Sequence, residues 1–511
     1  MVRPRPAIRD VRRRPERLVS AFIAAGLLAT AVTGCASQSA GTSASQSAHP
    51  PVPSPSRSTA AAPGTSAHPP TASAAPVNHG PSANAGNDAG NSSASSATAA
   101  NATAAVVAPA TPAAPLATVA NAATSGAGAS ASASIPEPAI SFDTWLARFR
   151  VEAKAAGIDD ATLRAGLQNV RLLPRVIELD RAQPEFTRPL WDYLDTAVSA
   201  QRVTRGQAKL RELRTVADAA SAQYGVPPEI IVAIWGMESN YGTYYGEIPT
   251  IDALATLAYE GRRAAWAQKQ LIAALRILQN GDITRARMIG SWAGAMGQTQ
   301  FLPSNFLAYA VDADGDGRRD IWGSMPDVIA STAHFLRREG WQPGQPWGVE
   351  VRLPAGFDHG RADDNLRQRS AQWAAEGIRA ADGGALPDLD DAAILLPAGA
   401  RGPAFLVGPN YRAILRYNSA MSYALGVGLL AQRIAGGPDV AAAWPRDLVP
   451  LSRSDVRTLQ QALNDKGFDS GAPDGMLGPA TRGAIRRYQR STGLAADGYP
   501  TTELLRRAQG F

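Results

Sequence analysis

The chain is poor in cysteine, in charge and in aromatic residues. A single cysteine in 511 residues cannot close an intramolecular disulfide or build a thiolate cluster for zinc or iron and sulfur, which excludes those two protein classes. Charged residues make up only 18% and aromatic residues 6% of the chain, which indicates that low-complexity filler dilutes the average. At about 150 residues per domain, the length predicts two or three folded units plus unstructured chain.

An apolar run long enough to span a bilayer is also missing. Residues 1–17 hold seven arginines, and the apolar stretch 18–32 that follows is shorter than the roughly 20 residues of a transmembrane helix. This pattern predicts a removable export signal over residues 1–34. The signal ends in Val32-Thr33-Gly34-Cys35, which resembles the bacterial lipobox, so we expect acylation of Cys35 and a lipid anchor. A coincidental cysteine behind an ordinary signal is the alternative.

The formal charge of +6 hints at an acidic partner such as nucleic acid. Cleavage before Cys35 removes seven arginines and two acidic residues, which leaves +1, so no nucleic-acid partner is expected. Residues 35–138 follow, rich in Ala, Ser, Thr and Pro and without an aromatic residue. Such a segment cannot bury a core and is predicted to be a disordered tether, with an end-to-end distance of about 50 to 60 Å.

Helical periodicity begins near Ile140 and predicts a mainly α-helical domain over residues 139–438, with one strand-like alternation at 348–353. After a Gly-Gly-Pro break, residues 446–511 form a separate small unit. Its helices are predicted at 454–466, 479–492 and 501–507.

Glu238 is the first candidate for chemistry. Pro228 opens an apolar helix in which Ile231, Ile234, Trp235 and Glu238 follow at i, i+3, i+4 and i+7, which predicts a carboxyl on the buried stripe. Desolvation there would raise its pKa and let it act as a general acid. A glutamate that pairs with a buried arginine and only braces helices is an equal alternative.

Longer motifs point to a family. Residues 235–242, Trp-Gly-Met-Glu-Ser-Asn-Tyr-Gly, and 291–304, Ser-Trp-Ala-Gly-Ala-Met-Gly-Gln-Thr-Gln-Phe-Leu-Pro-Ser, precede an Asp-Gly-Asp-Gly loop and a late Tyr-Asn pair. In this order, over about residues 140–437, they resemble the membrane-bound lytic murein transglycosylase B family. The resemblance implies a lysozyme-like (goose-type) helical catalytic domain that acts on peptidoglycan glycan strands. It also implies the periplasm, with the lipoprotein anchored to the outer membrane of a Gram-negative bacterium.

The implied reaction cuts the β-1,4 bond between N-acetylmuramic acid and N-acetylglucosamine and leaves a 1,6-anhydromuramoyl end. If the sugar's own C6 hydroxyl attacks, one carboxylate is enough and the chemistry requires no cofactor. Glu238 would first protonate the leaving oxygen and then take the C6 proton. A muramidase that uses water and a non-catalytic wall-binding lipoprotein are the rival functions.

Other site residues follow from the resemblance alone. Ser291 and Gln300 are expected to orient Glu238 and hold the saccharide, and Trp266 stands where the family has tyrosine. Core packing is the alternative for each aromatic residue. The remaining expected substrate contacts are Arg262, Arg263, Phe301, Tyr417, Asn418 and Tyr423.

Two further segments carry motifs. Asp312, Asp314, Asp316 and Arg318 have the register of an EF-hand loop, and the family closes a longer loop with an aspartate that aligns with Asp327. The loop is interpreted either as a site for a structural calcium ion or as an Asp-rich turn without metal. The segment 474–481, Asp-Gly-Met-Leu-Gly-Pro-Ala-Thr, resembles a small three-helix peptidoglycan-binding domain, whose arginines at 482, 486 and 487 are either a wall-binding face or a solvated one.

Overall fold

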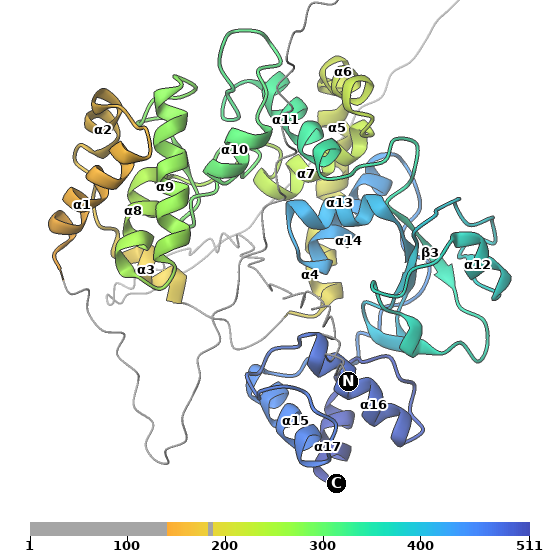
Figure 1. The fold of residues 1–511 in the computed structure, drawn as a ribbon. Helices are drawn as coiled ribbons and strands as arrows, with labels where there is room; N and C mark the ends of the chain where they lie inside the picture. Colours follow the sequence, from red (N-terminus) through yellow and green to blue (C-terminus); the bar gives the residue numbers. More distant parts are fainter. Residues whose placement is uncertain (1–139, 182–187) are drawn as a thin grey trace, which may run out of the picture. The chain divides into compact units, whose positions relative to one another are not determined.

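The structure is a computed structural model that describes residues 140–181 and 188–511 (Figure 1). The prediction of a mainly helical fold is confirmed, since helices dominate the described chain and the strands are few and short. The predicted signal over 1–34, the tether over 35–138 and Cys35 lie outside the described residues. Among the described helices, none has the length and apolarity that crossing a membrane requires.

One group of helices gathers around the pair α8 and α9, which pack against each other (Figure 1). Helices α1 and α3 pack on α8, and α2 packs on α9. Side-chain caps fix the starts of two of them: the Ser141 hydroxyl accepts the Thr144 N–H, and the Asp159 carboxylate accepts the Thr162 N–H at 2.6 Å. The group comprises α1 (Phe142–Ala155), α2 (Asp160–Leu167), α3 (Pro174–Arg181), α8 (Thr250–Glu260) and α9 (Ala264–Gln279).

A second group surrounds α7, which contacts α5, α6, α11 and α14. Helix α7 begins at Pro228, as predicted. A short helix, α10 (Pro303–Tyr309), contacts both α9 and α11 and so joins the two groups. The second group comprises α4 (Leu190–Ala197), α5 (Ala200–Glu212), α6 (Arg214–Tyr224), α7 (Pro228–Ser239), α11 (Met325–Arg338), α13 (Pro409–Tyr417) and α14 (Met421–Ile434).

Two small antiparallel sheets complete this part. The first pairs β1 (Ile248–Pro249) with β2 (Ile289–Gly290). The second has the order β4-β3-β6-β5 and a core of its own around Trp373 and Leu406. The alternation at 348–353 therefore is a strand, as predicted. The second sheet and its associated helices comprise β3 (Gly348–Arg352), η1 (His359–Arg361), α12 (Ser370–Ala375), β4 (Arg379–Ala380), β5 (Ala393–Leu395), η2 (Gly399–Arg401) and β6 (Ala404–Val407).

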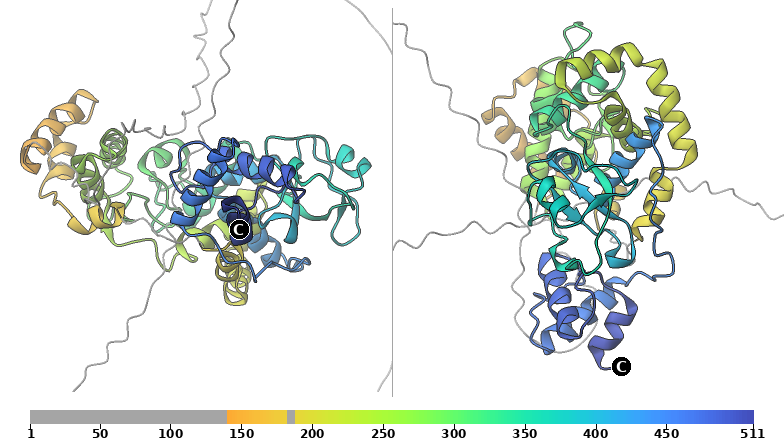
Figure 2. Two further views of the ribbon diagram at one scale, coloured as in Figure 1. Left: turned by 90° about the horizontal axis from the view of Figure 1, so that it is seen from below. Right: turned by 90° about the vertical axis from the view of Figure 1, so that its right-hand side faces the viewer.

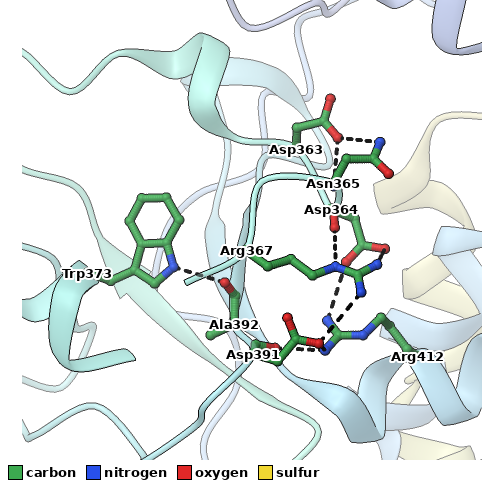
Figure 3. Close-up of polar contacts among 8 residues, drawn as sticks. All are labelled: Asp363, Asp364, Asn365, Arg367, Trp373, Asp391, Ala392 and Arg412. Carbon is green, nitrogen blue, oxygen red and sulfur yellow. Dashed lines mark hydrogen bonds and ion pairs between the residues drawn. The ribbon is translucent and has the colours of Figure 1, made fainter. Parts of the chain in front are cut away.

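An ion-pair network ties this sheet to α13 (Figure 3). The Arg412 guanidinium of α13 donates to Asp391 at 2.5 Å and lies 3.5 Å from Asp364. Arg367 lies 3.6 Å from Asp391 and donates to the Asp364 carbonyl. Two arginines and two aspartates thus balance their charges, and they hold in place the helix that ends at Tyr417.

The C-terminal unit is a bundle of three helices near the predicted ranges: α15 (Arg453–Asp465), α16 (Pro479–Ser491) and α17 (Thr502–Gln509) (Figure 2). Leu459, Ile485 and Leu504 belong to its own apolar core. Two of the three arginines considered for wall binding already have hydrogen-bond partners. Arg486 donates to Asp363 at 2.8 Å, and Arg487 donates to backbone carbonyls of its own unit. Neither is therefore a purely solvated side chain.

Candidate active site

Glu238 lies where a buried helix reaches the surface. Helix α7 is buried on all sides from Ile230 to Gly236, and Met237 and Glu238, in its last turn, are partly exposed. The apolar stripe predicted for this helix is therefore only part of a fully enclosed segment. Its enclosure by four other helices, rather than periodicity, places the carboxyl at the edge of the core.

The turn after Glu238 is locked by close packing. Three consecutive residues, Asn240, Tyr241 and Gly242, have positive φ angles of 49°, 60° and 75°. The Tyr241 ring packs edge-on against Trp235, with centroids 5.6 Å apart. A Cβ at position 236 would lie 2.5 Å from two carbons of that ring, so only glycine fits there. This interlock fixes the end of α7 and with it the Glu238 backbone.

A buried glutamine joins the second motif to the same turn. Gln298 accepts the Trp235 indole N–H at 2.9 Å and donates to the Trp322 carbonyl at 2.8 Å. Its side-chain oxygen also lies over Gly242, where a Cβ would approach it to 2.2 Å. Gln298 is not among the predicted site residues. It stands inside the quoted motif, two residues before Gln300, but its role depends on contacts with distant positions.

Tyrosines surround the Glu238 carboxyl. The Tyr423 hydroxyl of α14 donates to Oε1 at 2.6 Å. Burial raises the pKa of Glu238 to about 7, and the Tyr423 hydrogen bond opposes that rise. Tyr417 stacks on Tyr423 with ring centroids 6.4 Å apart, and its hydroxyl donates to the Thr299 carbonyl at 2.7 Å. Burial therefore favours the protonated form of Glu238 and brings its titration close to neutral pH, with tyrosine side chains around the carboxyl.

Tyr193 of α4 also lies near this carboxyl, although it is not among the predicted site residues. Burial, and then the nearby charge of Glu238, raise the pKa of Tyr193 to about 12. Tyr193 follows the buried Trp191 in an otherwise ordinary helix, and nothing local in the sequence marks it as a neighbour of the carboxyl. Within the described residues, no second carboxylate contributes to the shifted pKa of Glu238.

Ser291 and Gln300 lie in the turn that follows β2. The Ser291 hydroxyl accepts the Ala295 N–H at 3.1 Å. The Gln300 amide donates to the carbonyls of Tyr245 at 2.8 Å and Gly297 at 3.0 Å, so it ties this turn to the loop after α7. In the described chain, neither side chain makes a hydrogen bond to Glu238. Both shape loops that adjoin it.

Phe301 does not lie on the surface of the site. Its side chain is 1% exposed and packs against Tyr417 with ring centroids 5.7 Å apart. At this position Phe301 supports the Tyr417 ring, and a sugar cannot reach its side chain. Asn418 directly follows α13 as its C-cap, and its side-chain oxygen accepts the Ala420 N–H at 3.1 Å, which organises the start of α14.

Arg262 and Arg263 form a separate cluster beside α8 and α9. Arg262 donates to the buried carboxylate of Asp180 at 2.6 Å, and Arg263 donates to it at 2.5 Å. The Arg263 guanidinium lies 4.7 Å from the Trp266 ring centre and 5.6 Å from that of Trp292. Both arginines are thus already paired. Trp292 was overlooked, although it directly follows Ser291.

The acidic loop brings three carboxylates together. Oxygens of Asp312, Asp314 and Asp327 lie within 4.8 Å of one another. Asp327 is fully buried, and desolvation, with a smaller contribution from Asp314, raises its pKa. The Asp316 carboxylate is outside this group and accepts the Arg318 N–H at 2.8 Å. The predicted loop closure by Asp327 agrees with this geometry.

Comparisons with known proteins cover both folded parts. Residues 141–432 match the family described as Transglycosylase SLT domain, and residues 452–507 match the family described as Putative peptidoglycan binding domain. Membrane-bound lytic murein transglycosylase B of Escherichia coli (strain K12) is 32% identical over 295 residues, which are 55% of this chain and 79% of that protein.

Solved structures extend the likeness. SltB3 from Pseudomonas aeruginosa in complex with NAG-anhNAM-pentapeptide is 52% identical, with a TM-score of 0.71, and covers 72% of this chain and 99% of its own. The same protein in complex with NAG-NAM-pentapeptide is 53% identical, with a TM-score of 0.70 and the same coverage. The family model over residues 141–432 spans more than half of the chain.

Proposed function

This chain belongs to the SLT transglycosylase family, and on that premise we propose that it cleaves the glycan strands of peptidoglycan. It is a lytic transglycosylase that cuts between N-acetylmuramic acid and N-acetylglucosamine and leaves 1,6-anhydromuramic acid ends. Glu238 is assigned as the reacting group on one observation: burial raises the pKa of its carboxyl to about 7. A group with this pKa exchanges a proton readily in either direction near neutral pH.

Glu238 serves as the acid and then as the base. In its protonated form it donates to the glycosidic oxygen, the C1–O4 bond breaks, and N-acetylglucosamine leaves with a free 4-hydroxyl. The C6 oxygen of the same muramic acid bonds to C1, and the ionised Glu238 takes the C6 proton. The attacking hydroxyl is already tethered at high effective molarity, so no second carboxylate has to position water. This fits the described residues, among which no other carboxylate shifts the pKa of Glu238.

The surrounding groups support that cycle. The Tyr423 hydroxyl donates to Oε1 and orients the carboxyl, while Tyr417 and Tyr193 provide the polar and aromatic walls beside it. Ser291 and Gln300 shape the adjoining loops. The arginines Arg262 and Arg263, with Trp266, form a separate surface for the peptide acids of the strand.

Product analysis tests this function. Mass spectrometry of digested strands should show products about 18 Da lighter than those of hydrolysis, because no water is added. The Glu238→Gln variant should lose cleavage and keep binding to the wall. Reducing-end muramic acid as the main product would support the water-using muramidase instead, and unchanged cleavage by Glu238→Gln would contradict the role of this residue.

The C-terminal unit is a wall-binding module that keeps the enzyme on its substrate. Its match over residues 452–507 and its own helical core support this role. Cys35, with its lipobox-like surroundings, is the lipid attachment site, which would place the enzyme in the periplasm on the outer membrane. A tether between the anchor and the catalytic domain would let the enzyme search the nearby wall.

Calcium fits the acidic loop as a structural ion. Asp312, Asp314 and Asp327 offer carboxylate oxygens at one place, and these are the ligands that Ca²⁺ prefers. Repulsion between Asp327 and Asp314, which contributes to the raised pKa of Asp327, would be relieved by a cation. Calcium should therefore raise the melting temperature of the wild type and leave that of Asp327→Asn unchanged, and equal responses would contradict the site.

A further inference from the structure

Arg202 lies beside Met237, the residue before the proposed catalytic Glu238, and among the described residues it has no acidic partner. It belongs to α5, and the Tyr241 hydroxyl donates to its backbone carbonyl at 2.9 Å, so the interlocked turn after Glu238 also fixes the Arg202 backbone. Its guanidinium donates from Nη1 to the Met237 sulfur at 3.5 Å. A thioether is a weak acceptor and carries no charge, so it does not balance the cation.

Several other partly buried arginines of the described chain have acidic partners. Arg263 pairs with Asp180, Arg285 pairs with Asp252, and Arg319 pairs with Asp282, at distances from 2.5 to 2.8 Å. For Arg202, no described carboxylate forms an ion pair, and burial lowers its pKa while the neighbouring Arg205 adds repulsion. Desolvating a cation without a counter-ion is unfavourable, so a substrate anion that binds beside Arg202 would be stabilised.

Tyr193 lies near both this cation and the carboxyl, since the charges of Glu238 and of Arg202 both act on its pKa. The side chains of Met237 and Tyr193 meet over Gly426, where a Cβ would lie 3.3 Å from the Met237 methyl carbon and 3.4 Å from the Tyr193 ring. Gly426 is one helical turn beyond Tyr423, the hydrogen-bond donor to Glu238. Glu238, Met237, Tyr193 and Arg202 are all partly exposed. Met237 and Tyr193 therefore lie beside the guanidinium, Met237 next to Glu238 in the chain and Tyr193 near its carboxyl.

We propose that Arg202 binds a carboxylate of the substrate at a subsite next to the cleaved bond. This inference rests on the function proposed above. A peptidoglycan strand offers two sources of that charge: carboxylates of the stem peptide, or the lactyl carboxylate of muramic acid where the peptide has been removed. The planar guanidinium forms two parallel hydrogen bonds with either group, and the flexible Met237 side chain can yield to it.

Calorimetric titration of the full chain with three ligands tests the subsite. The ligands are the uncleavable anhydro-disaccharide with its peptide, the same disaccharide after amidase treatment, and neutral N,N′-diacetylchitobiose. Arg202→Leu should bind at least one of the two acidic ligands roughly ten-fold or more weakly and bind the neutral one unchanged. Arg211→Leu, an exposed arginine of the same helix, is the matched control. Arg202→Gln should reproduce the loss with a side chain that stays polar.

Each outcome has a distinct meaning. A loss confined to the peptide-bearing ligand identifies a stem-peptide carboxylate, and a loss confined to the amidase-treated ligand identifies the lactyl group. Equal loss for all three ligands would assign Arg202 a structural role and overturn the subsite. Unchanged binding of both acidic ligands by Arg202→Leu would overturn it too. If the wild type bound none of the three, the proposed function itself would fail, and the subsite with it.

Discussion

Ionisation of Glu238 should cost the folded protein free energy, and Glu238→Gln should remove that cost. The pKa rises from its ordinary value of 4.5 to about 7 in the folded chain. The folded state therefore keeps a proton that the unfolded state has lost. The favourable contribution is complete below pH 4.5 and disappears as pH rises through about 7. At 1.36 kcal/mol for each pH unit, the difference amounts to about 3 kcal/mol at pH 8.

Urea unfolding followed by circular dichroism at pH 4 and pH 8 measures this effect. Glutamine cannot ionise, but its side-chain oxygen still accepts the Tyr423 hydroxyl, so the local geometry is kept. Relative to the wild type, Glu238→Gln should gain about 3 kcal/mol of unfolding free energy between pH 4 and pH 8. Glu247→Gln, on the exposed loop after α7, measures the effect of losing a surface charge. If the two variants respond alike to pH, the burial of Glu238 does not control its ionisation.

Three other variants test separate parts of the account. Tyr423→Phe removes the hydrogen bond that lowers the pKa of Glu238, so the descending limb of the pH profile of kcat/KM should move to higher pH. A limb that stays in place would contradict that contact. Gly236→Ala should lose about 1 to 3 kcal/mol in thermal unfolding because its Cβ meets a fixed ring, whereas Gly483→Ala, which faces only a flexible arginine, should not. Cys35→Ala should leave the membrane fraction on cell fractionation, and full retention there would contradict acylation.

Local patterns predicted the elements well where the chain determines them by itself. Pro228 marks the start of α7 because proline suits a first helical turn, and the three C-terminal helices appear close to their predicted ranges. In the acidic loop, the register of Asp312 and Asp314 and the closure by Asp327 correspond to carboxylates that meet in space. These features depend on residues that lie close together in the sequence.

Long-range contacts decided what the sequence could not predict. Periodicity predicted a one-sided apolar stripe for α7, but four helices from elsewhere in the chain bury it on all sides. The arginines Arg262 and Arg263 look free in the sequence, and their partner Asp180 stands about 80 residues earlier. Tyr193 approaches the carboxyl, and Arg202 approaches Met237, only because α4 and α5 pack on other helices of the second group. No local signal distinguishes such residues from ordinary core or surface positions.

The enclosure of α7 also has a kinetic consequence. Its backbone amides, surrounded by the main apolar core, should exchange with deuterium only when the whole domain opens, and not through fraying of one helix. Glu238 belongs to the last turn of this helix, and the turn that follows is interlocked. Heat should therefore inactivate the enzyme at the rate of global unfolding. A partly open form in which only the Glu238 carboxyl is displaced should not accumulate.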